Sequence, residues 1–298
     1  MALSVAVLGP GGVGGLIAAA LARAGGDVTV IARESTVEVI ERDGIHVESV
    51  NLGAFVAHPA ATTLLDRDVD ALIIATKAVG LEQAIERIRR RPPLVLPLLN
   101  GLDHLALLRE HFAPETVLAG AIRVESDRPA PGTVVHTSPF LRVDMAGSPA
   151  LQEKMEQLAA QLSAAGIPAR VVATEAQVMW AKLVRLNALA CTTSAWDVEL
   201  GAIREDPARR AILEAAIREG AAVARAEGAD IPDEQAMREL DAAHATLGSS
   251  MQRDIAAGRE PELDAIPGAV LRAAARHGLE CPTIEGLVAE TRARIAAG

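Results

Sequence analysis

The sequence has few of the residues that mark secreted, metal-binding or nucleic-acid-binding proteins. Its 298 residues include only two cysteines, Cys191 and Cys281, which provide neither a disulfide framework nor the spacing of a metal site, so no metal is predicted. A formal net charge of -10 argues against nucleic acid or an anionic membrane as the main partner. No uncharged apolar run reaches the roughly 18–20 residues of a membrane-spanning helix, and the first residues lack a basic leader. These features predict a cytoplasmic globular protein.

Aromatic residues and lysines are also scarce. Half of the residues are hydrophobic, yet only three Phe, two Trp and no Tyr are present, so the core must be aliphatic. Among 29 basic residues the only lysines are Lys77, Lys154 and Lys182, and the others are arginines. The surroundings of each lysine therefore bear on function.

Short apolar runs alternate with helical segments in the first half of the chain. The expected strands are 4–9, 27–33, 70–77 and 93–101, and the expected helices between them are 14–26 and 80–91. Strands without a polar face that alternate with helices predict a parallel sheet covered on both sides. Further on, 128–137 and 141–147 read as edge strands, before a helix over 149–165 and a strand near 167–172.

The pattern changes after about residue 173, where every segment reads as helix. The expected helices are 174–191, 207–228, 232–247, 249–257, 261–277 and 283–297. We therefore predict an α/β protein with an N-terminal Rossmann-type parallel sheet domain, residues 1–170, followed by an all-helical C-terminal domain, residues 171–298.

A glycine-rich segment, GPGGVGG, spans Gly9 to Gly15 and follows the first strand. Gly9, Gly11 and Gly14 match G-x-G-x-x-G, and the segment opens a helix within a βαβ unit. In that context the first glycine permits a tight turn, the second lets a pyrophosphate approach, and the third lets helix and strand pack closely. The sequence thus predicts dinucleotide binding rather than a glycine-rich turn without a ligand.

The second strand ends at Arg33, where an NAD enzyme usually has an acidic residue. A guanidinium group suits the 2′-phosphate of NADP, so NADP is favoured over NAD. Glu34 follows immediately and leaves the alternative open, because its carboxylate could accept from a ribose hydroxyl.

Two further polar side chains end strands of the predicted sheet. Lys77 follows one strand and Asn100 follows the next. Each residue alone reads equally well as a surface lysine or a turn-forming Asn-Gly. Because ligands of open α/β sheets bind at the carboxyl ends of the strands, the pair favours cofactor or substrate contact.

Lys182 lies in the apolar segment 179–187, MWAKLVRLN. On the predicted helix 174–191, only Lys182 and Arg185 are basic, and apolar side chains occupy nearly every other side. A helix that is apolar all round is internal, so Lys182 is expected to enter a cleft and to serve as a proton donor. A lysine that reaches the surface or pairs with a carboxylate is the structural alternative, and the helix pattern alone favours it.

Two later segments hold polar residues that have ordinary structural explanations. GSSMQRDI (248–255) places Ser249 and Ser250 at a helix start, where serine is a common cap. EPELDAIPGAVL (260–271) places Glu262 in a first helical turn, where the helix dipole favours acidic residues. Taken singly, both segments are predicted to be structural.

Together these features resemble the ketopantoate reductases (2-dehydropantoate 2-reductases), and the resemblance runs almost end to end. The family motifs correspond to the glycines of the 9–14 loop, to Arg33, to ATKA with Lys77, to LNG with Asn100, to WAKL with Lys182, and to the run from Ser249 to Gly268. The resemblance implies an NADPH-dependent enzyme of pantothenate biosynthesis with its active site between two domains. It gives Lys182 the place of the catalytic lysine, which reverses the structural interpretation of this residue.

The match departs from the family in the substrate pocket. The family carries asparagines four and eight residues after the lysine, and this chain has Leu186 and Ala190 there. Asn187 is adjacent but lies about 100° further round a helix. Pro267 replaces the asparagine of the family's I-N-G. An aliphatic wall in place of amides predicts a substrate less polar than ketopantoate.

We therefore predict an NADPH-dependent oxidoreductase that reduces a 2-oxo acid or a similar carbonyl. The expected cofactor contacts are Gly9, Gly11, Gly12, Val13, Gly14, Arg33, Lys77 and Asn100. The expected catalytic residues are Lys182 and Glu262, and the expected substrate contacts are Asn100, Lys182, Asn187, Ser250 and Glu262.

Two alternatives keep the same fold and cofactor. In one the electrophile is another carbonyl or an imine, and in the other the protein is a regulator that senses NADP without turning it over. The expected partner is a small carbonyl compound, with a homodimer left open and no nucleic acid or membrane.

Overall fold

The computed structural model describes residues 2–297 and divides into two compact units. The sheet unit comprises residues up to Leu99 and His104–Val178. The helical unit comprises Asn100–Asp103 and the residues from Met179 onward. The boundary expected near residue 170 lies slightly before this division, and the extent of each functional domain stays a prediction.

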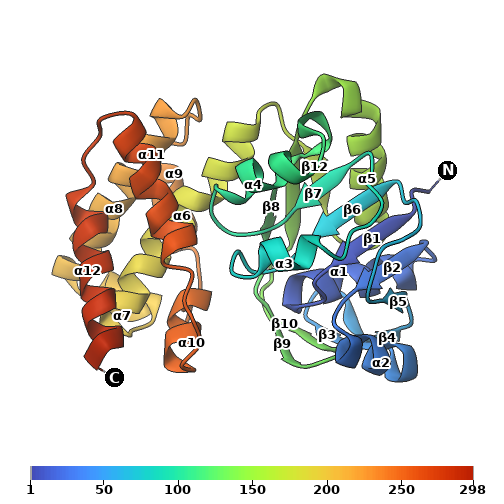
Figure 1. The fold of residues 1–298 in the computed structure, drawn as a ribbon. Helices are drawn as coiled ribbons and strands as arrows, with labels where there is room; N and C mark the ends of the chain where they lie inside the picture. The colour runs from blue at the N-terminus through green and yellow to red at the C-terminus, as the bar shows by residue number, and fades with distance from the viewer. Residues whose placement is uncertain (1, 298) are drawn as a thin grey trace. The chain divides into compact units, whose positions relative to one another are not determined.

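A five-stranded parallel sheet is the centre of the sheet unit (Figure 1). Its strand order is β5-β2-β1-β6-β7, and all neighbouring pairs are parallel. The strands are β1 (Val5–Leu8), β2 (Val28–Ile31), β5 (Ala60–Thr62), β6 (Ala71–Ile74) and β7 (Val95–Pro97). Every residue of β1, β2 and β6 is buried, which explains why these strands read as continuous apolar runs.

The helices between these strands are α1 (Gly12–Arg23), α2 (Glu34–Asp43) and α3 (Leu81–Ile85), and α4 (His104–His111) follows β7. The helix predicted over 80–91 is wrong in its second half, because α3 ends at Ile85. The backbone of residues 87–90 pairs with Leu65 instead: Leu65 donates to the Arg87 carbonyl, and its own carbonyl accepts from Arg89. Tertiary pairing there replaces continuation of the helix.

Two smaller sheets complete the sheet unit. One has the order β4-β3-β10-β9, with β3 (Ile45–Ser49), β4 (Gly53–Ala57), β9 (Ser126–Ala130) and β10 (Thr133–His136). The other has the order β12-β11-β8, with β8 (Ala119–Arg123), β11 (Arg142–Ala146) and β12 (Ala169–Val171). The single edge strand predicted over 128–137 is instead the hairpin of β9 and β10. Strand β9 lies at an edge, but β10 and β11 do not, because β10 pairs with β9 and β3, and β11 pairs with β8 and β12. Helix α5 (Gln152–Ala164) follows two short helical turns, η1 (Pro114–Thr116) and η2 (Pro149–Leu151).

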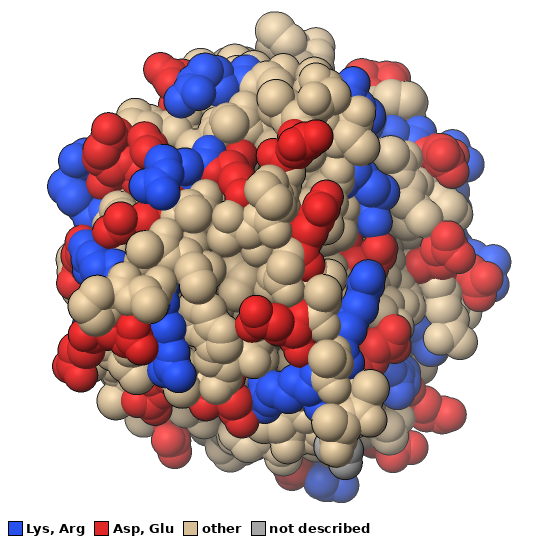
Figure 2. Space-filling model, turned by 90° about the vertical axis from the view of Figure 1, so that its left-hand side faces the viewer, with Lys and Arg blue, Asp and Glu red and all other residues tan. Residues whose placement is uncertain are grey.

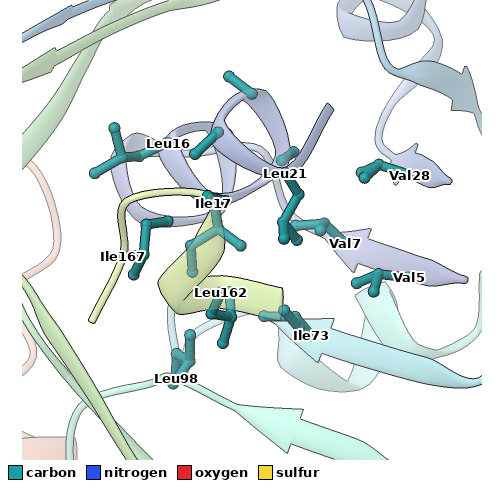
Figure 3. Close-up of a cluster of buried hydrophobic side chains, with 14 of the residues drawn as sticks. Val5, Val7, Leu16, Ile17, Leu21, Val28, Ile73, Leu98, Leu162 and Ile167 are labelled. Atoms are coloured by element: carbon teal, nitrogen blue, oxygen red, sulfur yellow. The ribbon is translucent and has the colours of Figure 1, made fainter. Parts of the chain in front are cut away.

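The aliphatic core predicted from composition lies against α1. Figure 3 shows side chains of α1, of β1, β2 and β6, and of α5 in one apolar cluster; they include Leu16, Ile17, Leu21, Val7 and Leu162. All five are at most 1% exposed. The cluster holds the glycine loop's helix on the parallel sheet.

The helical unit contains most of α6 (Glu175–Trp196), whose first turn belongs to the sheet unit. The other helices are α7 (Leu200–Glu205), α8 (Pro207–Ala226), α9 (Asp233–Asp241), α10 (Ser250–Ala256), the π-helix η3 (Asp264–Gly268), α11 (Ala269–Arg276) and α12 (Pro282–Ala297). The helix predicted over 232–247 ends early, at Asp241, and α7 was not predicted. The helix start predicted at residue 207 is confirmed, and the carboxylate of the preceding Asp206 caps it by accepting from the amides of Ala208 and Arg209.

The fold class is confirmed: a parallel-sheet unit precedes a helical unit. No helix within residues 2–297 is long and apolar enough to cross a membrane. On the face of the helical unit in Figure 2, acidic and basic side chains are interspersed, without a large patch of one sign.

Candidate active site

The glycine loop leaves the carboxyl end of β1 and enters α1. Gly9 has φ +88°, a left-handed conformation that favours glycine, and its amide donates to the Ile31 carbonyl of the neighbouring strand β2. A Cβ on Gly14 would overlap the carbonyl oxygen of Gly9, so the third glycine permits the close packing of helix and turn. Both positions therefore have the backbone role that the motif predicts.

Gly11 differs from its neighbours because a Cβ there would meet no atom within 4 Å. It is the N-cap of α1 and provides no capping side chain, and the first turn of α1 contains no acidic residue. The start of α1 therefore combines open space at Gly11 with the positive end of the helix dipole, which is a combination that can accept a phosphate. By contrast, a Cβ on Gly12 would overlap the backbone of Ser126 in β9, so Gly12 is required by the fold itself.

Polar side chains flank the glycine loop at the ends of β2 and β6, the two neighbours of β1. Arg33 is exposed and is the N-cap residue of α2, with exposed Glu34 next to it. Lys77 is exposed and follows β6. The two cations therefore lie on either side of the loop, at the edge of the sheet where dinucleotides bind.

Thr76 is a residue that the sequence analysis missed. Its Oγ1 is buried and has no hydrogen-bond partner within the described part of the chain, while its methyl group would lie 2.7 Å from a Cβ on Gly9. A buried hydroxyl beside the glycine loop is suited to a ligand that offers a hydrogen bond. Its position directly before Lys77 at a strand end was the available signal.

Asn100, Lys182 and Glu262 come together in the helical unit, although they are far apart in sequence. The Lys182 Nζ donates to the Asn100 Oδ1 at 2.8 Å. The Asn100 Nδ2 donates to the Glu262 Oε2 at 2.9 Å. An amide side chain offers an acceptor to the ammonium and a donor to the carboxylate, so Asn100 joins the two charged groups.

These three residues are largely withdrawn from solvent. Glu262 is 7% exposed, and Lys182 and Asn100 are partly buried. Trp180, at 2% exposure, and the buried Leu183 and Val184 anchor the same stretch of α6 in the core. The surrounding apolar atoms strengthen the hydrogen bonds that hold the ammonium and the carboxylate.

Arg185, the other basic residue of this part of α6, forms an ion pair with Glu239 of α9 at 3.3 Å. Leu186, one turn after Lys182, is partly exposed, and Ala190 is fully buried. Residues four apart share a helix face, so the aliphatic side chain of Leu186 lies next to Lys182 on the face that bears the ammonium.

Ser249 and Ser250 have different roles at the start of α10. Ser249 is the N-cap and accepts from the Gln252 amide at 3.0 Å, and its hydroxyl also forms a hydrogen bond with the Thr193 hydroxyl of α6 at 2.8 Å. The capping role predicted for this segment is therefore confirmed for Ser249. Ser250 is partly buried at the first position of α10, and its contact with substrate stays a prediction.

Asn187 is fully buried on a different side of α6 from Lys182. Its Oδ1 accepts from the Cys191 thiol at 3.5 Å, and its Nδ2 has no partner within the described residues. Burial raises the pKa of the Cys191 thiol to about 12, so this cysteine stays protonated and is no nucleophile. The structure does not join Asn187 to the Asn100 group, and its proposed contact with substrate stays untested.

No group of three or more His, Cys, Asp or Glu residues that could hold a metal occurs between residues 2 and 297. A cavity of about 290 Å³ is lined by residues that include Ser4, Asp70, Arg91 and Pro93. These residues precede β1, β6 and β7, at the opposite edge of the sheet from the glycine loop, and none is a predicted site residue.

A glycine-rich βαβ unit followed by a helical unit that holds a lysine, an asparagine and a glutamate in one network is the arrangement of a two-domain, dinucleotide-dependent oxidoreductase. Comparison with known proteins gives the family. The model "Ketopantoate reductase PanE/ApbA" matches residues 5–145, and the model of its C-terminal part matches residues 176–295. The chain belongs to the ketopantoate reductase PanE/ApbA family.

Individual relatives cover nearly the whole chain. A 2-dehydropantoate 2-reductase of Halobacterium salinarum is 30% identical over 292 residues, which is 96% of each chain. The crystal structure of 2-dehydropantoate 2-reductase from Geobacter metallireducens has a TM-score of 0.89 at 26% identity and covers 97% of this chain and 99% of that one. A D-mandelate dehydrogenase with NADH and anilino(oxo)acetate has the same fold, with a TM-score of 0.88, 21% identity and 98% of both chains covered.

Proposed function

We propose that the protein is an NADPH-dependent reductase of 2-oxo acids, similar to 2-dehydropantoate 2-reductase. The observation that carries the proposal is the chain of hydrogen bonds from Lys182 through Asn100 to Glu262. It gives a positioned ammonium and a positioned carboxylate, which are the groups needed to protonate and to orient a carbonyl substrate.

NADPH, when bound, supplies the hydride for the carbonyl carbon. In this proposal Gly9, Gly11, Gly12, Val13 and Gly14 hold its pyrophosphate, and Lys77 and Asn100 are further contacts. Arg33 selects the 2′-phosphate, because a guanidinium forms charge-assisted bonds with phosphate. Its exposure after β2 and the open space at Gly11 fit this cofactor.

Lys182 is the proposed proton donor to the developing alkoxide. An ammonium group has three N–H donors, and one of them is directed at the Asn100 Oδ1. The bond to Asn100 fixes the direction of the ammonium, from which Lys182 is proposed to donate to the substrate oxygen. Glu262, held through the other end of Asn100, is proposed to bind a polar group of the substrate and to keep Asn100 in the orientation that accepts from lysine.

The proposed substrate has a less polar side chain than ketopantoate. Leu186 beside Lys182 and buried Ala190 replace two amides of the family, and an aliphatic wall cannot satisfy a substrate hydroxyl. The D-mandelate dehydrogenase of the same fold is named for a substrate with an aromatic side chain. A role in pantothenate biosynthesis, a cytoplasmic location and a homodimer stay predictions.

The test is a screen of turnover, with NADPH absorbance as the readout. The panel comprises ketopantoate, 2-oxo acids with aliphatic and aromatic side chains, simple ketones and cyclic imines. We expect the highest kcat/KM with an apolar 2-oxo acid. Turnover of the cyclic imines alone would favour imine reduction, and binding of NADPH without turnover of any compound would favour a sensor.

A further inference from the structure

The short loop that carries Asn100 is part of the helical unit, although it interrupts the sheet unit in sequence. Residues 100–103 follow the last apolar residues after β7 and precede α4. The position of the Asn100 side chain therefore depends on what attaches this four-residue loop to the helices of the helical unit.

Two attachments are visible. At Gly101, which has φ +83°, a Cβ would overlap the carbonyl oxygen of Ala265, so the loop backbone lies directly against η3. At Asp103, the carboxylate accepts from Arg272 of α11 at 2.5 Å. The first contact is steric and the second is ionic, and both hold the loop on the segment that follows Glu262.

Arg272 bonds to both sides of this junction. Besides Asp103, its guanidinium donates to the Asp264 side chain at 2.7 Å and to the Asp264 carbonyl oxygen at 2.9 Å. Asp264 opens η3, two residues after Glu262, and the Glu262 carbonyl accepts from the Ile266 amide at 2.9 Å. One arginine thus connects the loop of Asn100 with the turn that carries Glu262.

The local backbone makes room for this arginine. Pro267 has no amide proton, and the Leu263 carbonyl accepts instead from the Gly268 amide at 3.0 Å, which widens the turn into a π-helix. A Cβ on Gly268 would lie 3.0 Å from the Asp264 Oδ1 and 3.1 Å from the Arg272 Nη1. The glycine therefore lets the ion pair lie close to the turn.

The contribution of these ion pairs to global stability does not explain the arrangement. The side chains of Arg272, Asp103 and Asp264 are 42%, 52% and 88% exposed, and exposed ion pairs contribute little to global stability. Their value lies in which segments they join, since a hydrogen-bonded group such as Asn100 must be positioned within a fraction of an ångström to be useful.

We propose that Arg272, with Asp103 and Asp264, is a positioning residue that holds Asn100 against Lys182 and Glu262. The inference rests on the proposed function, because it assigns catalytic value to the Asn100 network. Arg272 does not touch the reacting groups and acts only through the 100–103 loop and η3.

The test compares Arg272→Gln with Arg276→Gln, a control one turn further along α11. Arg276 forms a comparable exposed ion pair, with Glu227 at 3.2 Å. For Arg272→Gln we expect kcat to fall about 3- to 10-fold and the NADPH Kd to change less, because Asn100 is only one of several proposed cofactor contacts. Arg276→Gln should retain the original kcat, and Arg272→Lys should recover part of it because an ammonium can still pair with the carboxylates.

Repeating the substitution in an Asn100→Ala protein distinguishes loss of Asn100 positioning from a general disturbance of the fold. In an Asn100→Ala protein, Arg272→Gln should cause no further loss of kcat, because the group that Arg272 positions is already gone. Equal losses in both backgrounds would overturn the proposal, and so would an unchanged kcat in Arg272→Gln or an equal loss in the control.

Hydrogen exchange of the 98–104 peptide distinguishes failure of this inference from failure of the proposed function. Faster exchange in Arg272→Gln but not in Arg276→Gln supports the attachment without any reference to turnover. Unchanged exchange overturns the attachment even in an active enzyme. Absence of turnover in the unmodified protein would instead contradict the proposed function.

Discussion

Helices α1 and α6 are both largely buried, yet they bury different types of residue. The buried residues of α1 are glycine or apolar, from Gly14 to Leu21. Those of α6 include Asn187, Thr192, Thr193 and Ser194, each 0% exposed. Helix α1 therefore needs small residues that let its backbone pack closely, whereas α6 needs hydrogen-bond partners for its buried polar side chains.

The polar groups of α6 that are hydrogen-bonded have partners of two kinds. Thr192 and Thr193 donate to carbonyls of the preceding turn, those of Ala188 at 2.8 Å and Leu189 at 2.7 Å, so the helix itself satisfies them. Lys182 donates to Asn100, which lies 82 residues away. We therefore propose that α6 positions the side chain of a functional group, whereas α1 positions its own amides.

The largest expected effect is at Lys182. Lys182→Ala should lower kcat by roughly 10²–10⁴, the range for loss of a positioned proton donor. Lys182→Arg should recover little, because a guanidinium is bulkier and does not give up its proton near neutral pH. Steady-state kinetics on both variants provide the measurement. Lys154→Ala, which changes a lysine of α5 in the sheet unit, is the control and should leave kcat unchanged.

For α1 the comparison predicts two opposite glycine phenotypes. Gly11→Ala should fold normally, because its Cβ meets no atom and its backbone is extended, but NADPH affinity should fall at least about tenfold where the pyrophosphate approaches. Gly14→Ala should lose stability, by about 1–3 kcal/mol, because its Cβ overlaps the Gly9 carbonyl. Urea unfolding and NADPH titration separate the two. Normal NADPH affinity in Gly11→Ala would contradict the proposal that the glycine loop binds the pyrophosphate.

We propose that cofactor choice depends on Arg33, next to this loop. Arg33→Ala should raise the KM for NADPH by roughly 10- to 150-fold, the equivalent of about 1.5–3 kcal/mol for a charged hydrogen bond, and leave the KM for NADH nearly unchanged. Arg42→Ala, an exposed arginine on the same helix, is the control. Equal use of both cofactors by the unmodified protein would contradict the role of Arg33.

We propose that substrate choice depends on the side chains beside Lys182 on α6. Ketopantoate should not be the best 2-oxo acid, and Leu186→Asn should shift kcat/KM toward ketopantoate by about tenfold, because an amide can pair with its hydroxyl. The ratio of kcat/KM for ketopantoate and for an apolar 2-oxo acid, measured on both proteins, decides the matter. A preference for ketopantoate in the unmodified enzyme would show that Leu186 does not make the enzyme prefer a less polar substrate.

The smallest expected effect is a pH dependence of stability in the sheet that packs on α1. Burial lowers the pKa of His136 in β10, which lies between Ser49 and Ser138. The unfolded chain then takes up a proton below about pH 6.5 before the folded protein does, so stability should fall as pH decreases through that value. Urea unfolding at pH 7.5 and 5.5 should show a smaller pH difference for His136→Gln, and an identical difference in both proteins would exclude the imidazole as the cause.

Much of the sheet unit was predictable because its constraints are local. The buried parallel strands read as continuous apolar runs, and the G-x-G-x-x-G spacing fixes a turn whose geometry depends on backbone alone. The interior positions of β10 and β11 were not predictable, because each depends on pairing with a distant strand. The early end of α3 has the same cause, since Leu65 competes for its backbone.

In the candidate site, too, individual residues could be predicted from local sequence, but the contacts between distant segments could not. Lys182 could be singled out as a rare cation in an apolar helix, and Asn100 and Glu262 as motif residues, but no local pattern shows that one amide joins the other two. Thr76 and the Asp103–Arg272 pair were missed because their meaning depends on packing between segments. Asn187 shows the converse: its amide suggests a substrate contact, while the structure places it in the core beside Cys191.

The most direct test asks whether α1 serves NADPH binding while α6 serves proton donation. NADPH affinity is measured by fluorescence, and the single-turnover rate is measured at saturating NADPH. Both measurements use the same preparations of Lys182→Ala and Gly11→Ala. The account predicts a Lys182→Ala protein that binds NADPH normally but has lost turnover, and a Gly11→Ala protein that binds NADPH weakly but reacts at a near-normal rate once saturated. Near-normal turnover in Lys182→Ala, or loss of its NADPH binding, would contradict the claim that Lys182 is held in an apolar helix to donate a proton.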